Sequence, residues 1–243
     1  QGQKMAALGN DPRLAAMLIA AKSDDEAATA ARLAAILEEP PRGAGSDLGQ
    51  AFSRNQSNWQ QRSQQLLRRL NRRGGKADSD AIPALLAQGF PDRIARRRGL
   101  DGRYQLANGM GAMLDSDDAL SRHEWLIAPL LLQGNASPDA RILQAYALDI
   151  DALAAQCPQL IEQSDTIEWD EAQGTLKAFR RSRIGQLTVK VQPLAKPSED
   201  ELHQAMLNGI RDKGLNVLNW TEDAQQLRLR LQCAARWLPD EAW

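Results

Sequence analysis

IPALLAQGFPDRIARRRGLDGRYQLANG, residues 82–109, contains the change of pattern from which we predict the fold. Its first part, Ile82 to Gln88, has the composition of a short helix, and Gly89 is a typical helix end. From Arg103 onward, apolar and polar residues partly alternate in short segments separated by Gly, Asn and Asp, as is typical of strands. The chain is therefore predicted to be helical before this stretch and mainly β after it.

Upstream of this stretch, three helical patterns predict an all-helical domain. The pair Asp11-Pro12 is suited to begin a first helix, and an S-x-x-E capping box at Ser23 begins a second. We assign residues 1–80 to this helical domain. The third helix is predicted to be long and to be built on apolar residues at heptad spacing, Phe52, Trp59 and Leu66.

Downstream, five or six short segments rich in aliphatic and aromatic residues predict a small β-barrel. One helix, predicted over residues 150–161, precedes the fourth segment, and such a helix is typical of an OB-like barrel. We assign residues 81–195 to this OB-like domain. The segments are Arg103–Leu106, Trp125–Leu132, Arg141–Leu148, Thr166–Trp169, Thr175–Ile184 and Leu187–Val191.

The last part of the chain, residues 196–243, is predicted to be helical again. Ser198 and Glu201 form another capping box, and apolar residues follow at helical spacing from Leu202. A further helix is predicted after Thr221. The expected fold class is therefore α+β, with a helical domain, a small OB-like β-barrel and C-terminal helices.

Charge is segregated along the chain, although the net charge is -1. Residues 62–103 contain 11 basic and 4 acidic side chains, and residues 177–190 contain 5 basic and 0 acidic ones. Between them, residues 104–176 contain 2 basic and 12 acidic side chains. Two basic islands therefore flank an acidic stretch, and local charge is more informative about partners than the total.

The two basic islands contain the candidate nucleic-acid-binding residues. Guanidinium groups suit phosphate oxygens and aromatic rings can stack on unpaired bases, so RNA binding is one hypothesis. The other, equally open from the sequence, is that these cations pair with the acidic stretch or lie on a solvated surface. The candidates are Arg93, Arg96, Arg97, Arg98, Lys177, Arg180, Arg181 and Arg183.

The sequence predicts no catalytic, cofactor-binding or metal site in this chain. The phosphate-binding pattern G-x-x-x-x-G-K-[ST] is absent, and the two histidines have no partner that would indicate catalysis. Cys157 and Cys233 have neither disulfide-framework nor zinc-site spacing. No apolar run approaches the roughly 20 residues that a membrane span needs, so we expect no membrane partner and a cytoplasmic location.

Several motifs in combination resemble the DEAH-box RNA helicases. FPDRIARRR at residues 90–98, YQLANG at 104–109 and EWLIA at 124–128 resemble the OB-like domain of that family. MAALGNDPRLAAML at residues 5–18 resembles the start of its helical ratchet domain. RIGQL at residues 183–187 and the helical segment 199–237 are similar to the HrpB branch of bacterial helicases. The resemblance covers essentially the whole chain, and we expect an internal fragment of an HrpB-type helicase.

The resemblance implies a parent in which two RecA-like motor domains bind ATP and Mg and translocate on RNA. Those motor motifs are absent here, so none of the family's catalytic residues is transferred to this chain and no cofactor is expected in it. In the family, the ratchet helix and the OB-like domain touch the RNA backbone, which favours RNA binding by the basic islands. Residues 40–47 depart from many eukaryotic relatives, because no histidine follows Asp47.

We therefore expect a non-catalytic accessory region that lines the RNA path and couples motor movement to strand translocation. Its expected partners are single-stranded RNA and the motor domains of the same polypeptide. The alternative is a protein-interaction module that docks a partner, or those motor domains, without touching RNA. Binding of a protein partner without retention of RNA would distinguish the second function from the first.

Overall fold

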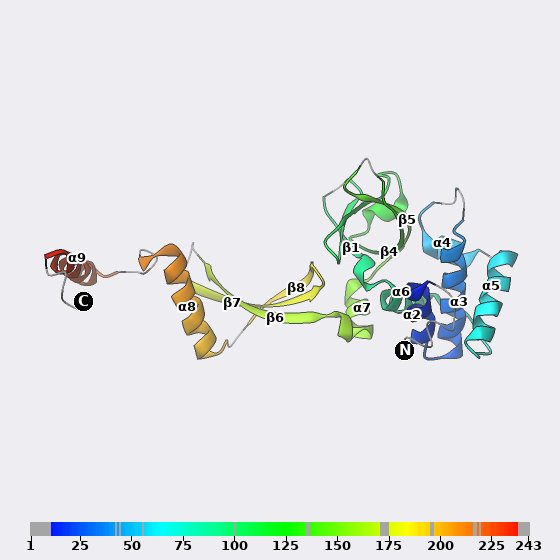
Figure 1. The fold of residues 1–243 in the computed structure, drawn as a ribbon, viewed down its shortest axis with the longest axis horizontal. Coiled ribbons are helices and arrows are strands. Elements are labelled where there is room, and N and C mark those ends of the chain that lie inside the picture. Colours follow the sequence, from blue (N-terminus) through cyan, green and yellow to red (C-terminus); the bar gives the residue numbers. More distant parts are fainter. Residues whose placement is uncertain are drawn as a thin grey trace. The chain divides into compact units, whose positions relative to one another are not determined.

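The computed structural model describes residues 11–237 except 42, 44, 55, 100, 135–136, 171–174, 195–196, 216–217 and 219, and omits the side chain of Trp169. Residues 5–10 of the ratchet-like motif lie outside the described residues. Two compact units are present (Figure 1). The first unit comprises Gln1–Gln163 and Ser182–Lys190, and the second comprises Ser164–Arg181 and Val191–Trp243. The predicted boundaries near residues 80 and 195 stay predictions.

The first unit begins with helices that are capped as the sequence predicts. The Asp11 carboxylate accepts a hydrogen bond from the Arg13 backbone N–H, and Ser23 Oγ accepts one from Glu26 N–H. The Glu26 carboxylate accepts the Lys22 N–H, which satisfies another donor at this helix start. The helices are α2 (Pro12–Ala20), α3 (Asp24–Glu38), α4 (Leu48–Ser53), α5 (Ser57–Arg69) and α6 (Ile82–Gly89).

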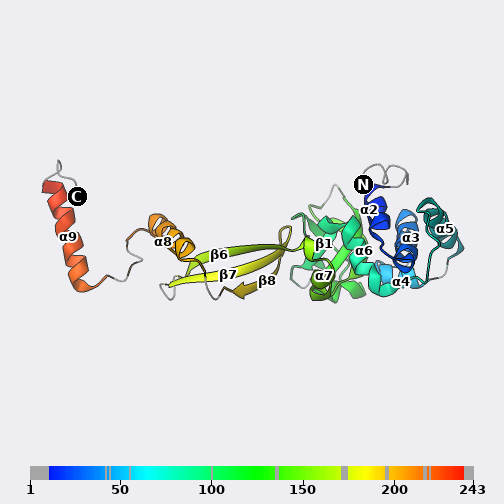
Figure 2. The same cartoon turned by 90° about the horizontal axis from the view of Figure 1, so that it is seen from below.

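Helix α3 lies between α2 and α5 and is almost entirely buried (Figure 2). Six of its residues are alanine, and such small side chains let neighbouring helices approach closely. Leu33 is 0% exposed at the centre of this packing. Helix α5 closes the far side through Trp59, whose indole N–H donates to the Glu39 carbonyl at 3.0 Å.

The prediction of one long third helix is wrong, because the structure divides it into α4 and α5. Arg54 ends α4 with an extended backbone, φ -79° and ψ 139°, which no α-helix can continue through. Phe52 therefore lies on a different helix from Trp59 and Leu66, although all three are buried. Heptad spacing correctly identified buried positions, but it could not identify the break between them.

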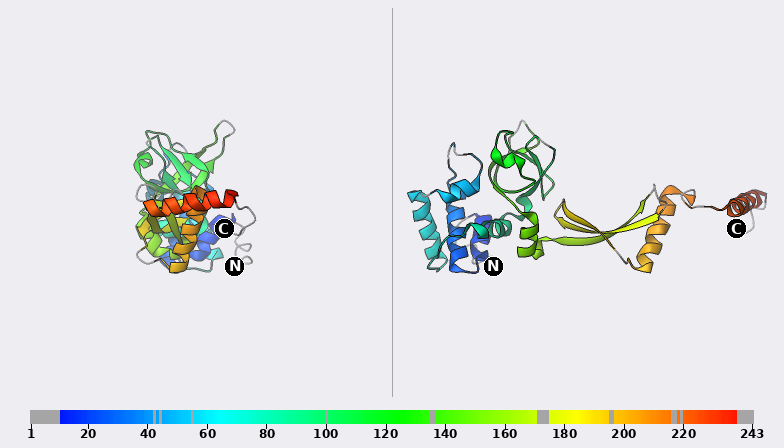
Figure 3. Two further views of the ribbon diagram at one scale, coloured as in Figure 1. Left: turned by 90° about the vertical axis from the view of Figure 1, so that its left-hand side faces the viewer. Right: turned by 180° about the vertical axis from the view of Figure 1, so that it is seen from behind.

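Five strands form the predicted small barrel (Figure 3, right). The barrel is closed in the order β1-β2-β3-β5-β4, and only the β3–β5 pair is parallel. Its interior holds Tyr104, Leu106 and Leu126, all 0% exposed. Helix α7 (Ile150–Gln156) follows the last strand, where one helix was predicted. The strands are β1 (Ile94–Arg97), β2 (Arg103–Leu106), β3 (Gly111–Met113), β4 (Trp125–Leu132) and β5 (Ala140–Ala147).

The three remaining strands do not belong to the barrel, contrary to the prediction. They are β6 (Glu162–Asp170), β7 (Thr175–Ile184) and β8 (Leu187–Pro193), and they form a separate sheet in the order β6-β7-β8. The barrel is already closed without them, because β3 pairs with both β2 and β5. Moreover, β7 is at least partly exposed along both faces until Ile184, so it could not line an apolar interior.

Two further helices, α8 (Glu199–Lys213) and α9 (Glu222–Trp237), complete the described chain. The predicted capping box at Ser198 and Glu201 is present at α8. Among the described residues of the second unit, no side chain is buried. Helices and a closed barrel together confirm the α+β fold class. None of the described helices is long and apolar enough to cross a membrane.

We predict that Leu33→Ala lowers the free energy of unfolding by about 2–5 kcal/mol, because it leaves a cavity in a packed helical core. Urea unfolding of the full chain measures the change. The matched control is Leu229→Ala in α9, where the same atoms are removed from a side chain that is 57% exposed. The control should change stability by less than about 0.5 kcal/mol. Equal effects at the two positions would contradict the packing described for α3.

Tyr104 provides a prediction about pH. Burial raises its pKa to about 12, and its hydroxyl donates toward the carbonyl oxygens of Leu120 and His123. An unfolded tyrosine loses its proton at about pH 10. Between that pH and about 12, the folded state therefore retains a proton that the unfolded state has lost. We expect this contribution to stability to be complete below about pH 10 and to disappear as the pH rises toward 12.

The chain contains 2 tyrosines, so Tyr146→Phe leaves Tyr104 as the single phenol. Tyrosinate absorbance during an alkaline titration then measures the Tyr104 pKa directly. In a second variant, Tyr104→Phe, we expect a loss of about 1 kcal/mol at neutral pH and a weaker alkaline decline in stability. An ordinary phenol titration in the folded Tyr146→Phe protein would refute the burial of this hydroxyl.

Candidate nucleic-acid interface

The candidate cations of the first basic island lie where the chain enters the barrel, on the 3₁₀ helix η2 (Pro91–Arg93), on strand β1 and directly after it. Arg93 Nε is buried, lies 3.4 Å from Asp92 and makes no hydrogen bond among the described residues. Arg97 donates to the Arg122 carbonyl at 2.9 Å, and Arg98 lies 3.8 Å from the Asp139 carboxylate. Most of these cations are therefore held by protein groups on the barrel.

Arg96 makes the most contacts of this island. Its guanidinium pairs with Glu124 at 3.0 Å and lies over the Trp125 ring, 5.2 Å from the ring centre. It also donates to the Thr188 carbonyl at 3.0 Å, which ties the β7–β8 turn to β1 within the first unit. Removal of this side chain would therefore affect packing as well as charge.

The second basic island lies on β7 and is paired with acids of β6. Arg180 makes two hydrogen bonds of 2.8 Å with the Asp165 carboxylate, Arg181 lies 2.6 Å from Glu168, and Lys177 pairs with Asp170. The hydrogen bond from Arg180 lowers the pKa of Asp165. The same bond raises the pKa of Arg180. These exposed pairs reduce the local positive charge but contribute little stability.

Arg183, the last candidate, differs from the other β7 cations. It is exposed, belongs to the first unit, and makes no ion pair or side-chain hydrogen bond among the described residues. Alternation along a strand puts Arg181 and Arg183 on one face of β7 and Arg180 on the other, but it cannot identify which of them have carboxylates opposite. Among the described residues, Lys177, Arg180 and Arg181 have a carboxylate partner on β6, whereas Arg183 has none.

The structure also identifies partners that the sequence analysis missed. Arg13 forms two hydrogen bonds with Asp92, at 2.6 and 3.0 Å, and lies over the Phe90 ring. The hydrogen bond to Asp92 raises the pKa of Arg13. Burial acts to raise the pKa of Asp92, but the hydrogen bonds and the charge of Arg13 act to lower it, and the net pKa of Asp92 is lowered. Asp92 lies within the basic residues 62–103 and not in the acidic stretch, so the segregation of charge gave no signal for this pair.

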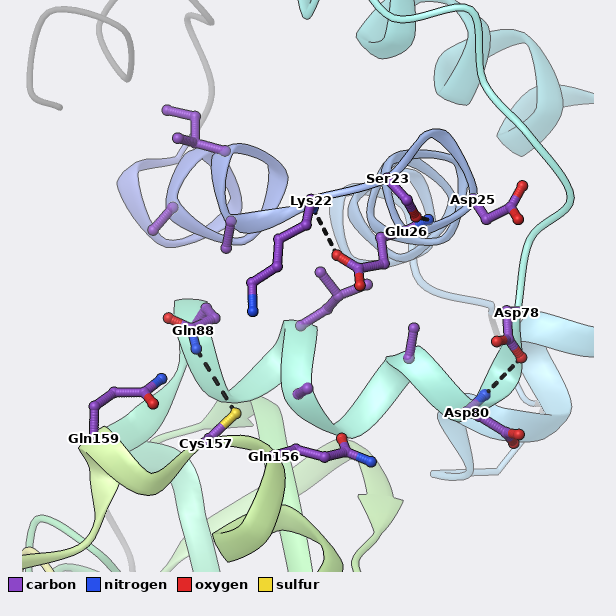
Figure 4. A pocket seen from close by; sticks show the side chains of 16 residues that line it. Lys22, Ser23, Asp25, Glu26, Asp78, Asp80, Gln88, Gln156, Cys157 and Gln159 are labelled. Carbon is purple, nitrogen blue, oxygen red and sulfur yellow. Dashed lines mark hydrogen bonds between the residues drawn. The ribbon is translucent and has the colours of Figure 1, made fainter.

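A cavity of about 780 Å³ is lined by α2, α3, α6 and the chain around Cys157 (Figure 4). Asp78 and Asp80 lie at one end, whereas Gln88 and Cys157 lie at the other. Burial raises the pKa of the Cys157 thiol, so this sulfur is a poor nucleophile. The carboxylates disfavour a phosphate, and no histidine lines the cavity.

A search for metal-ion sites covers only the residues that the structure describes. No group of three or more His, Cys, Asp or Glu side chains in those ranges could hold a metal ion. Cys157 is buried and Cys233 is exposed, and both are free thiols. The functional candidates therefore remain the cations of the barrel and of the β6–β8 sheet, which suit binding rather than bond making or breaking.

Comparison with known proteins places these features in a family. A family model described as "ATP-dependent RNA helicase HrpB, connector region" matches residues 160–194, which contain the β6–β8 sheet. The ATP-dependent RNA helicase HrpB of Escherichia coli is 80% identical over 100% of this chain, which covers 30% of that protein. The chain therefore spans about 30% of the length of this relative.

Solved structures agree with the sequence match. The E. coli DExH-box NTPase HrpB has a TM-score of 0.78 and 80% identity over 100% of this chain and 30% of its own. A second structure, the Escherichia coli DEAH/RHA helicase HrpB, has a TM-score of 0.75 and 75% identity with the same coverage. These matches confirm the predicted resemblance, because over its full length this chain is similar in sequence and in fold to a segment of the HrpB-type DEAH/DExH-box helicases.

Proposed function

We propose that this chain is a non-catalytic accessory region of an ATP-dependent RNA helicase, and that it lines the RNA path. The observation that carries the proposal is the 80% identity to an ATP-dependent RNA helicase over every residue of the chain. The charge distribution supports it, because the exposed cations Arg96 and Arg98 lie on or beside the barrel. Coupling of motor movement to strand translocation belongs to the same proposal.

In this proposal the basic groups hold phosphates, and they differ in how readily they do so. Arg183 has no ion pair to break among the described residues, and Arg97 is held by a carbonyl rather than a carboxylate. Arg96, Arg180 and Arg181 must first exchange a carboxylate for a phosphate. Such an exchange is nearly neutral in energy at the surface, so these residues contribute less to affinity than Arg183.

ATP and Mg would be bound by motor domains outside this chain, which lacks the phosphate-binding pattern. RNA and those motor domains are the proposed partners, and the cytoplasm is the proposed location. The chain's own contribution is to hold the strand while the motor domains move. Because phosphate contacts displace counterions, the affinity for RNA should fall steeply as salt is added.

We expect Arg183→Gln to weaken binding of single-stranded RNA about threefold and to reduce the slope of log K against log salt by about 0.7, the value for one lost phosphate contact. Arg97→Gln should act in the same direction. Fluorescence anisotropy at several salt concentrations measures both quantities, and all RNA sequences should be affected alike.

The matched control for this experiment is Arg62→Gln in α5, where Glu38 already pairs with the guanidinium at 2.6 Å. It should leave affinity and salt slope nearly unchanged. If Arg183→Gln and Arg97→Gln both leave the slope unchanged, the phosphate contacts are refuted. Retention of the motor domains at low salt without any RNA would instead favour the protein-interaction alternative.

A second prediction concerns a substitution that should raise the affinity for RNA. Glu124→Gln removes the carboxylate that neutralises Arg96, so we expect RNA affinity to rise about twofold to threefold and the salt slope to steepen. Glu38→Gln removes the partner of Arg62 and serves as the matched control, with no gain expected. Equal gains from both variants would indicate a general charge effect and would contradict a contact at the barrel.

The protein-interaction alternative is favoured by one observation in the second unit. Helix α9 exposes Leu227, Leu229, Leu231 and Trp237, and Trp237 is 82% exposed. Apolar side chains concentrated on one helix are typical of a surface that another protein segment covers. In this second candidate function the chain docks a protein segment, or the motor domains, without touching RNA, so the RNA-binding measurements above distinguish it from the first.

A further inference from the structure

Six of the 11 basic side chains of the first basic island lie on α5 and the chain that follows it, away from the barrel (Figures 1 and 2). Residues 57–76 contain 6 basic side chains and 0 acidic ones. Helix α5 packs on α3, on the side opposite to α2 and α6. We call these cations the α5 patch. They are Arg62, Arg68, Arg69, Arg72, Arg73 and Lys76.

Two cations of the α5 patch have no carboxylate partner in the first unit. Arg68 and Arg73 are exposed and make no ion pair or side-chain hydrogen bond among the described residues. The undescribed residues of the first unit contain no Asp or Glu in their sequence. Every carboxylate side chain of this unit is therefore accounted for, and none of them neutralises these two guanidinium groups.

Two other arginines of the patch are neutralised by acids of α3. Arg62 pairs with Glu38 at 2.6 Å, and Arg72 pairs with Asp24 at 3.3 Å. These cations belong to the same segment and carry the same charge, but each would have to exchange a carboxylate to bind another anion. They are therefore matched controls for the two unpaired arginines.

The backbone after α5 is held in place by hydrogen bonds. Arg72 N–H donates to the Leu67 carbonyl at 3.0 Å, around Asn71 in the left-handed region at φ 54°, as in a Schellman motif. Gly75 N–H then donates to the Asp24 carbonyl at 3.0 Å, at the start of α3. The chain between these two contacts is fixed, so that ordering its side chains around a ligand costs less conformational entropy.

The helix dipole explains only part of this charge. Cations in the last turn of a helix are stabilised by the terminal carbonyl groups, and Arg68 and Arg69 lie in that turn of α5. Arg73 follows the end of the helix, beyond the turn in which this effect operates. The patch therefore contains more positive charge than stabilisation of α5 explains.

The rest of this surface restricts the class of ligand. Residues 57–76 expose no large apolar side chain, and their single aromatic residue, Trp59, is 3% exposed. Protein interfaces usually have an apolar or aromatic centre, and unpaired bases stack on aromatic rings. The exposed face instead carries the amides of Gln61, Gln64 and Gln65. Guanidinium groups suit phosphate oxygens, and amides can exchange hydrogen bonds with hydroxyl groups.

We propose that the α5 patch binds the sugar–phosphate backbone of double-stranded RNA, with Arg68 and Arg73 as its phosphate contacts. In an RNA duplex the bases are paired, and proteins recognise mainly its phosphates and 2′-hydroxyl groups. The proposal rests on the proposed function and deepens it, because it adds a surface for paired RNA to one for the single strand. The barrel would hold the unpaired strand, and the α5 patch would hold a duplex.

The two surfaces are separated by the helical packing. Helix α3 lies between α5 and α6, and α6 contacts barrel strand β4. An α-helix with its side chains is about 10–12 Å across, which exceeds the Debye length of about 8 Å at physiological ionic strength. Substitutions in the α5 patch should therefore change duplex binding without changing the affinity of the barrel for single-stranded RNA.

The experiment compares a blunt-ended RNA duplex with single-stranded RNA of the same length, by fluorescence anisotropy of the full chain at several salt concentrations. For the double variant Arg68→Gln/Arg73→Gln we expect duplex affinity to fall about tenfold. The slope of log K against log salt should decrease by about 1.8, the value for two lost contacts with a duplex. The affinity for single-stranded RNA should change by less than about twofold.

The matched control is the double variant Arg62→Gln/Arg72→Gln, which removes two equal charges from the same segment. It should weaken duplex binding by less than about twofold. Urea unfolding shows whether each variant keeps its fold. The single variants Arg68→Gln and Arg62→Gln repeat the comparison within α5, without altering the chain after the helix. Equal losses from the unpaired and the paired arginines in folded proteins would overturn the proposal.

Two further outcomes would also refute a duplex site. One is an equal loss of affinity for duplex and single-stranded RNA in Arg68→Gln/Arg73→Gln, which would mean that the patch binds any phosphate chain. The other uses an oligoglutamate peptide of the same total charge as the duplex. Tighter binding of this peptide than of the duplex, lost in the same variant, would identify a docking surface for an acidic protein segment.

The failure of this inference is distinguishable from the failure of the proposed function. If Arg183→Gln and Arg97→Gln weaken single-strand binding while Arg68→Gln/Arg73→Gln leaves duplex binding unchanged, only the duplex site is refuted. If the duplex binds through the patch but single-stranded RNA does not bind the chain, the proposed function fails and the duplex site is supported. If neither RNA binds, both are refuted.

Discussion

Burial of one continuous apolar core is the constraint on which the first unit depends. Leu14 and Leu33 of the helices share this core with Ile94 and Ile127 of the barrel strands and with Ile184 near the β7–β8 turn. The barrel has a second, separate core around Tyr104 inside it. Because the outer face of the barrel is buried against helices, the strand entries and the β7–β8 turn are fixed with respect to α2, α3 and α6. The positions of the basic residues follow from that packing.

Electrostatics has a secondary role that depends on this scaffold. The cations of the two islands are not an undivided basic surface, because Arg96, Arg180 and Arg181 each have a carboxylate within 3.0 Å. Exposed pairs of this kind stabilise the fold very little. Because of these pairs, the cations differ in how readily they can bind a phosphate. Arg183 has no carboxylate partner among the described residues, whereas the paired arginines must exchange a carboxylate for the phosphate.

Local patterns predicted much of the secondary structure. Strands β2, β4 and β7 have the predicted bounds, because alternation and flanking turn residues act over a few positions. The capping boxes at Ser23 and Ser198 also begin helices as expected. The failures involve information that is not local. Strand β3 is only three residues long and was not among the predicted segments, yet it pairs with both β2 and β5 in the closed barrel, and β6–β8 form another sheet.

The sequence by itself determined the helical and β segments, the segregation of charge and the absence of a phosphate-binding loop, since each depends on residue type and spacing. Only the tertiary structure decided which carboxylate neutralises which arginine, that Arg183 remains unpaired among the described residues, and that Gln144 donates to the Gly45 carbonyl. Those features join residues such as Gly45 and Gln144, which are far apart in the chain. Long-range pairs are set by strand register and core packing, which no short window of sequence contains.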